Sequence, residues 1–134
     1  GRSLTALRIW DVRRALAWLL QERGLAPAGI ATYGRGEAGV AGLYAALLES
    51  GIGHVVMREP TASHLEGAAL PAILRHADLA EMAGLLAPRR LTLLSRRPEA
   101  FARTRDLYRR TSAEAAFRCV ADVAAAFAEG GGPC

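Results

Sequence analysis

The sequence predicts a three-layer α/β/α fold built on a mainly parallel β-sheet. Short apolar runs at 29–33, 54–57 and 91–95 are bounded by turn residues, as buried strands are. The strands are apolar on both faces and are separated by segments with helical periodicity, which is typical of a parallel sheet covered on both sides. The 134 residues are enough for one domain and show no internal repeat.

The first element is predicted to be a helix over residues 4–23. Gly24 supplies its stop. Its apolar side chains recur at helical spacing, at Ile9, Val12, Leu16 and Leu19. Trp10 and Trp18 lie off this stripe, so we expect them to contact another part of the protein.

The strand at 29–33 leads through a glycine-rich turn into a helix predicted over 38–50. That helix carries apolar residues at an i, i+3, i+4, i+7, i+8 spacing, namely Val40, Leu43, Tyr44, Leu47 and Leu48. Gly51 ends it, and the strand at 54–57 follows.

Residues 58–77 are predicted to be irregular. Asp78 and Glu81 have the spacing of a capping box, which opens a short helix before the third strand at 91–95. Pro98 suits the first turn of a further helix that reaches Arg110.

The C-terminal part is predicted to hold one more helix. Thr111 and Glu114 resemble a second capping box. Four apolar residues at near-helical spacing follow them: Phe117, Val120, Ala124 and Phe127. Residues 130–134 are interpreted as a flexible glycine-rich tail outside a single unit at 1–129.

Composition argues against several partner classes. All 17 basic residues are arginine, scattered as four adjacent pairs and as single residues rather than clustered with stacking aromatics, so we expect no nucleic-acid partner. No apolar run is long enough to cross a membrane. The two cysteines, Cys119 and Cys134, are too few for a disulfide framework or a zinc knuckle, and Cys119 is interpreted as a small core residue.

The turn between the first strand and its helix has two interpretations. Residues 34–39 (Gly-Arg-Gly-Glu-Ala-Gly) satisfy G-x-G-x-x-G between a strand and a helix, as in a dinucleotide-binding fingerprint. Glu59 then stands near the position of the ribose-binding acid. The same turn also fits a nucleophile elbow, G-x-S-x-G, in which Gly36 stands at the position of the serine.

Several segments in the same order resemble the acetylxylan-esterase-like and dienelactone-hydrolase-like branch of the α/β-hydrolase superfamily. They are the Asp-Val-x-Arg-Ala-Leu pattern at 11–16, the turn at 33–39, residues 70–79, and Leu-Ala-Pro-Arg-Arg-Leu at 86–91. The resemblance covers roughly residues 2–110. It implies that the chain is the C-terminal half of an α/β-hydrolase fold, with a final strand near 115–120.

The catalytic residues that this resemblance implies are missing. Gly36 cannot form an acyl-enzyme. Ser-Arg-Arg-Pro at 95–98 stands where the acid should follow the third strand, and Glu99, the nearest carboxylate, suits a helix first turn. No histidine follows His76. The catalytic position is therefore degenerate.

Other polar groups are given structural interpretations. Ser63, His64 and Glu66 lie on one predicted surface loop, and triad members normally come from separate segments. His64 and Glu66 with His76 and Asp78 contain metal-ligand types, but capping explains the aspartate, and we expect no metal. His54 is interpreted as a hydrogen-bonded residue at a strand end.

The sequence thus predicts a non-catalytic hydrolase-like segment, without a cofactor, that serves as a structural or binding part of a larger esterase-type protein. The turn residues Gly34, Arg35, Gly36 and Glu37 are the candidate site for an anion, because backbone N–H groups at a helix N-terminus attract one. Glu37 is expected to pair with Arg35.

The expected partners are the rest of the polypeptide and a small acidic or carbohydrate-ester ligand. The alternatives are a dinucleotide-binding unit, and part of an active ester hydrolase whose catalytic residues lie elsewhere.

Overall fold

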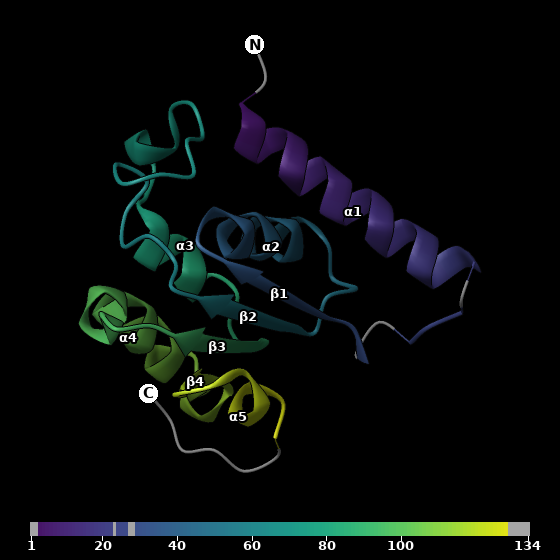
Figure 1. Cartoon of the computed structure of the whole chain (residues 1–134). Coiled ribbons are helices and arrows are strands. Elements are labelled where there is room, and N and C mark those ends of the chain that lie inside the picture. The colour runs from purple at the N-terminus through teal and green to yellow at the C-terminus, as the bar shows by residue number, and fades with distance from the viewer. Residues whose placement is uncertain (1–2, 23, 27–28, 129–134) are drawn as a thin grey trace.

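Parallel strands in chain order form the centre of the computed structural model, which describes residues 3–22, 24–26 and 29–128 (Figure 1). The four-stranded sheet has the order β1-β2-β3-β4, and every pairing in it is parallel. Its strands are β1 (Ala31–Arg35), β2 (His54–Arg58), β3 (Arg90–Leu94) and β4 (Phe117–Cys119). The predicted α/β class and parallel sheet are confirmed, and the carboxyl ends of all the strands share one edge.

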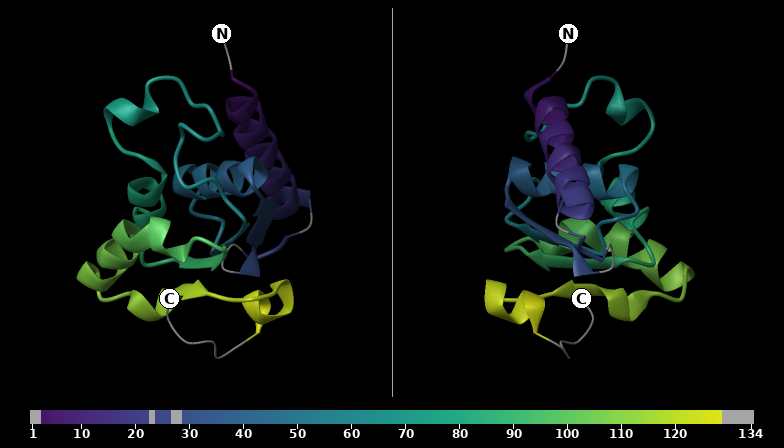
Figure 2. Two further views of the ribbon diagram at one scale, coloured as in Figure 1. Left: turned by 60° about the vertical axis from the view of Figure 1, so that its left-hand side comes forward. Right: turned by 90° about the vertical axis from the view of Figure 1, so that its right-hand side faces the viewer.

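Helices lie on both faces of this sheet, as the sequence predicts (Figure 2). One face carries α1 (Leu4–Glu22), α2 (Glu37–Leu48), α3 (Leu79–Gly84) and α4 (Ala102–Arg110). The other face carries α5 (Val123–Phe127). Short 3-10 turns complete the path at Ile73–Arg75, Pro98–Phe101 and Glu114–Ala116.

Alternation along the strands explains why there are two apolar clusters of unequal size. Val55 and Met57 of β2 join the main core beneath α2, α3 and α4. Val56 points the other way and packs with Leu94 and Ala126, the latter from α5. Because α5 is short, it covers only part of the second face, and Tyr33 of β1 remains 47% exposed.

The predicted apolar stripe of the first helix is confirmed. Ile9 and Leu16 are buried, and α1 packs along α2. Arg13 also pairs with Glu49 at 2.6 Å, which ties the middle of α1 to the end of α2. Trp10 and Trp18 lie on the outer side, each about half exposed at 53% and 51%.

The structure corrects the element boundaries at both ends of the sheet. β1 begins at Ala31 and runs through Gly34 and Arg35, which the sequence had assigned to the turn. The predicted last helix is wrong at its start: residues 117–119 form β4, and α5 begins only at Val123. The final strand implied near 115–120 is therefore present.

Two smaller C-terminal predictions also change. Thr111 makes no capping box, because its hydroxyl donates to carbonyl oxygens of the preceding turn. Cys119 packs against the core as predicted, but it is disulfide-bonded, which was not predicted. The tail predicted at 130–134 lies outside the described residues. No helix among the described residues is long and apolar enough to span a membrane.

The capping box at the start of α3 is confirmed and yields a test. Asp78 Oδ1 accepts the N–H groups of Leu79 at 2.7 Å and of His64 at 2.9 Å, while Glu81 accepts the Asp78 N–H. Replacing Asp78 with alanine is expected to lower the free energy of unfolding by about 1–2 kcal/mol, since both N–H groups lose their acceptor. Urea denaturation measures this. Asp106→Ala, at a side chain of α4 that is 44% exposed, is the control and should change stability by less than about 0.5 kcal/mol.

Candidate functional site

A single residue, Gly36, turns the chain from β1 into α2. β1 ends at Arg35 and α2 begins at Glu37. Gly36 has φ 55° and ψ −130°, a conformation that side-chain-bearing residues rarely adopt. Its N–H donates to the carbonyl oxygen of Arg58 at 2.8 Å, which fixes the turn against the end of β2. The chain thus turns sharply from strand to helix over one residue, and this turn is called the elbow below.

The flanking glycines have a packing role. A Cβ atom on Gly34 would overlap the amide nitrogen of Gly39 and lie 2.7 Å from the carbonyl oxygen of Ala38. A Cβ atom on Gly39 would lie 2.7 Å from the carbonyl oxygen of Gly34. The strand and the first turn of α2 therefore touch backbone to backbone. Position 36 itself is open, with its nearest neighbour, the Glu59 carbonyl oxygen, 4.0 Å from the Cβ site.

The predicted ion pair between Glu37 and Arg35 is wrong. Glu37 pairs with Arg8 of α1, with 2.8 Å between Oε2 and the guanidinium. Residues 35 and 37 lie on either side of the elbow, whereas α1 packs along α2 and brings Arg8 to the start of that helix. Arg35 is exposed and lies beside Arg58 in the β1–β2 register. The four predicted turn residues thus remain neighbours, but with a different charge partner.

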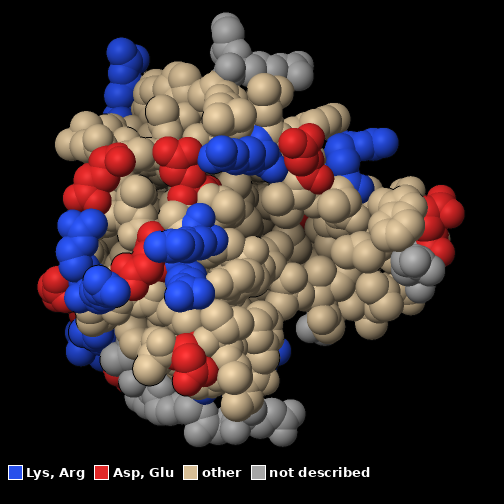
Figure 3. All heavy atoms as spheres, viewed as in Figure 1, with Lys and Arg blue, Asp and Glu red and all other residues tan. Residues whose placement is uncertain are grey.

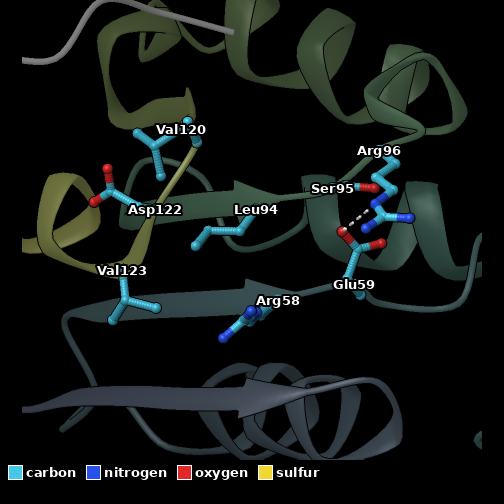
Figure 4. Close-up of a pocket in the computed structure, with 9 residues that line it drawn as sticks. Arg58, Glu59, Leu94, Ser95, Arg96, Val120, Asp122 and Val123 are labelled. Carbon is cyan, nitrogen blue, oxygen red and sulfur yellow. Dashed lines mark ion pairs between the residues drawn. The ribbon is translucent and has the colours of Figure 1, made fainter.

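Beyond the elbow, a cleft of about 560 Å³ opens at the carboxyl ends of β2, β3 and β4 (Figure 4). Parallel sheets commonly bind ligands at this edge. Arg58 and Leu94 lie in the middle of the cleft in Figure 4, between two groups of residues. One group follows β2 and β3, and the other runs from the residue after β4 to the first residue of α5. The lining residues are Arg58, Glu59, Leu94, Ser95, Arg96, Val120, Ala121, Asp122 and Val123.

Most polar groups around this cleft already interact with residues nearby. Asp122 caps α5, where it accepts the N–H of Ala125 at 2.8 Å. Glu59 lies 3.9 Å from Arg96, a loose pair because the Arg96 side chain is 93% exposed. Ser95 Oγ accepts the N–H of Arg97 at 3.1 Å. In the part of the chain that the structure describes, no histidine lines the cleft, so Ser95 has no histidine beside it there.

The three predicted loop residues do not form a catalytic trio. His64 is buried, with its Nε2 atom 2.8 Å from the Tyr44 hydroxyl and its Nδ1 atom 3.0 Å from the carbonyl oxygen of Ala68. Because a carbonyl only accepts, Nδ1 carries the proton and Nε2 accepts from Tyr44. Burial, with a smaller contribution from Asp78, raises the pKa of Tyr44 to about 12. This contact fastens the loop after β2 to α2.

The candidate metal ligands are likewise occupied elsewhere. Glu66 binds Arg97 through both carboxylate oxygens, at 2.8 and 3.3 Å, and accepts the N–H of Ala62. The Arg97 guanidinium holds the pKa of this carboxyl below its usual value. His76 is exposed, and Asp78 caps α3. Among the described residues no group of His, Cys, Asp and Glu is arranged to hold a metal ion.

The Tyr44–His64 contact gives a second test. Tyr44→Phe leaves the buried Nε2 atom of His64 without its donor, so the free energy of unfolding is expected to fall by about 1–3 kcal/mol. Tyr33→Phe is the matched control. Because Tyr33 is 47% exposed, removal of its hydroxyl group should change the free energy of unfolding by less than about 0.5 kcal/mol. Equal urea midpoints for the two variants would contradict the buried hydrogen bond.

Sequence reasoning missed the cleft because its walls come from separate segments. Glu59 and Ser95 each follow a strand directly, and Asp122 precedes a helix. Polar residues immediately after successive parallel strands are a readable signal of such an edge. The fourth strand was predicted as helix, however, and this hid the contribution of residues 120–123.

Comparison with known proteins adds no relative. No family model, no curated protein and no solved structure matches this chain.

Proposed function

We propose that this chain is a non-catalytic, α/β-hydrolase-like segment of the acetylxylan-esterase-like type, which serves as a structural or binding part of a larger esterase-type protein. The observation that carries the proposal is Gly36. It has the backbone geometry of a nucleophile elbow, and it has no side chain with which to attack a substrate.

The order of the elements supports this proposal. A helix, α1, precedes the elbow strand and packs beside the helix that follows the elbow. Three further strands are then added in sequence on one side of β1, and the terminal helix α5 crosses to the opposite face. This is the arrangement that the resemblance implies for the C-terminal half of a hydrolase fold.

The positions of the other two catalytic groups also support a non-catalytic role. An acid would follow β3, where Ser95 and Arg96 stand, and a histidine would follow β4, where Val120 to Asp122 stand. Loss of one triad member slows a serine hydrolase by several powers of ten. With glycine at the nucleophile position, and with no histidine among the described residues that line the cleft, the serine–histidine mechanism lacks both its nucleophile and its base here.

The proposed partner, the rest of the polypeptide, has a place to bind at the free edge of β1. In the described part of the chain β1 pairs on one side only, with β2. An apolar groove of about 210 Å³ runs between this edge and α1, lined among others by Leu16, Leu19 and Ile30. Thr32 Oγ1 is buried there without a hydrogen-bond partner among the described residues. A further strand along β1 would fill the groove.

The proposed ligand is small, and either acidic or a carbohydrate ester. The N-terminus of α2 offers the N–H groups of Glu37 and Ala38 to a carboxylate, because the N–H of Gly36 is already bonded to Arg58. Figure 3 shows acidic side chains among the arginines on the face drawn there, so that face carries no uniform basic surface.

The full-length protein tests the proposal with a serine-reactive fluorophosphonate, followed by mapping of labelled peptides. We expect no adduct within residues 1–134. An adduct within this segment, together with ester hydrolysis that Gly36→Val abolishes and Gly36→Ala preserves, would overturn the proposal. An adduct elsewhere would identify the protein as an active hydrolase and this segment as its auxiliary half.

One observation favours a Rossmann-type dinucleotide-binding unit as the second candidate. Glu59 directly follows β2, where such folds place the acid that binds the ribose. Against it, the turn is one residue long, and the four strands described here run in one order, without the reversal that creates a dinucleotide crevice. This candidate predicts saturable NAD binding that weakens in Gly36→Val, and calorimetry measures it.

A further inference from the structure

We propose that the cleft at the carboxyl ends of β2, β3 and β4 binds a short aliphatic carboxylate, with Arg58 as the group that holds the anion. The inference rests on the proposed binding role, and it names the ligand class and the residues. It places the ligand in the cleft beside α5, on residues distinct from the turn at Gly34 to Glu37.

The shape of the cleft sets the size of the ligand. Its volume of about 560 Å³ lies in the range of small-molecule sites. Leu94, Val120 and Val123 form its apolar part and continue into the small cluster beneath α5. Leu94 is buried, with 6% exposure. An alkyl chain of a few carbons can cover this surface.

The charges select an acid rather than an amine or a neutral ester. Asp122 is committed to the cap of α5, and Glu59 lies nearest Arg96. Among the described residues no carboxylate lies within ion-pair distance of Arg58, although its side chain lines the cleft. A planar guanidinium matches a carboxylate through two parallel hydrogen bonds.

A second polar group is positioned to assist. Ser95 Oγ accepts the N–H of Arg97, and within the described segments its own hydroxyl proton has no acceptor, so it can be donated to a ligand. Ser95 and Arg58 follow or end adjacent strands and line the same cleft. The ligand would thus meet a cation, a hydroxyl donor and an apolar wall.

The test is a butyrate titration of the full chain, followed by amide chemical shifts. Butyrate is expected to produce saturable shifts at Ser95 and at residues 120–123, with a dissociation constant on the order of 1–10 mM for so small and exposed a ligand. Butyramide has the same shape without the charge, and is expected to bind at least about tenfold more weakly.

Matched variants separate the cleft from general charge effects. Arg58→Gln is expected to weaken butyrate binding by about tenfold or more, because the anion loses a charged hydrogen-bond donor. Arg103→Gln removes an exposed arginine from α4, outside the cleft, and should leave binding unchanged. The inference would be overturned by shifts that do not approach saturation at about ten times the highest expected dissociation constant, by equal binding of butyramide, or by equal effects of the two variants. None of these outcomes bears on whether fluorophosphonate labels a serine, so the two proposals fail separately.

Discussion

Replacing Gly34 with alanine is expected to cost about 3 kcal/mol or more of the free energy of unfolding. The added Cβ would overlap the amide nitrogen of Gly39 and press on the carbonyl group of Ala38. These are backbone atoms within the first turn of α2, so they cannot rotate aside as a flexible side chain does. A domain of this size has about 5–15 kcal/mol in total, and the loss would leave little reserve.

The same substitution two residues later provides the control. At Gly36 the Cβ meets open space, and only the positive φ of 55° opposes it. Gly36→Ala is therefore expected to cost about 1–2 kcal/mol, from backbone strain alone. Urea denaturation of both variants measures the difference. If Gly34→Ala proved no less stable than Gly36→Ala, the close contact between β1 and α2 would be refuted.

Acidification is expected to destabilise the fold through His54. This residue is buried at 4% exposure, its Nε2 atom lies 2.9 Å from Thr92 Oγ1, and its ring contacts Phe127 of α5. Burial, with smaller contributions from Arg90 and Arg118, lowers the pKa of His54 to about 4. The folded protein therefore resists protonation that the unfolded chain accepts.

The direction of the pH effect follows from that difference. In the unfolded chain the imidazole takes up a proton near pH 6.5, so this contribution to stability is complete above that pH. It is lost as the pH falls from about 6.5 to about 4, where the folded protein is protonated too. Between pH 7.5 and 4.5 the expected loss from His54 is about 2–3 kcal/mol.

Denaturation at the two pH values, compared among variants, isolates this contribution. His54→Gln removes the titrating group. The loss of unfolding free energy between pH 7.5 and 4.5 should therefore be smaller in this variant by about 2–3 kcal/mol. His76→Gln removes an exposed histidine and should leave the dependence as it is in the unaltered protein. An unchanged slope in His54→Gln would show that the imidazole titrates normally in the folded state.

Local patterns predicted those parts of the fold whose sequence signal comes from a single element. The apolar stripe of α1 and the capping box of Asp78 each depend on residues within one or two turns, and both appear as predicted. The prediction for β4 is wrong because Phe117 and Val120 are three residues apart, a spacing that also places two side chains on one face of a helix. They in fact serve opposite faces of the sheet, Phe117 in the main core and Val120 beneath α5. Only the tertiary arrangement distinguishes the two cases.

The candidate site was predictable at the turn and not at the cleft. Three glycines in six residues between a strand and a helix locate the elbow at Gly36 without further information. The partner of Glu37 depends on how α1 lies against α2, so nearness in the sequence points to Arg35, whereas the fold brings Arg8 to Glu37. The cleft joins residues that are far apart in the chain, and it becomes visible only once the strand order is known.

The order of the strands also bears on how this chain folds as it is synthesised. Each strand pairs with the one translated just before it, so every strand pairing spans a single crossover. Such sequential topology keeps contact order low for a parallel sheet and favours rapid folding. The N-terminal elements emerge from the ribosome first, and α1, β1 and α2 have all their mutual contacts before β4 exists. α5 then covers part of the apolar second face, which the earlier strands would otherwise leave open to other chains.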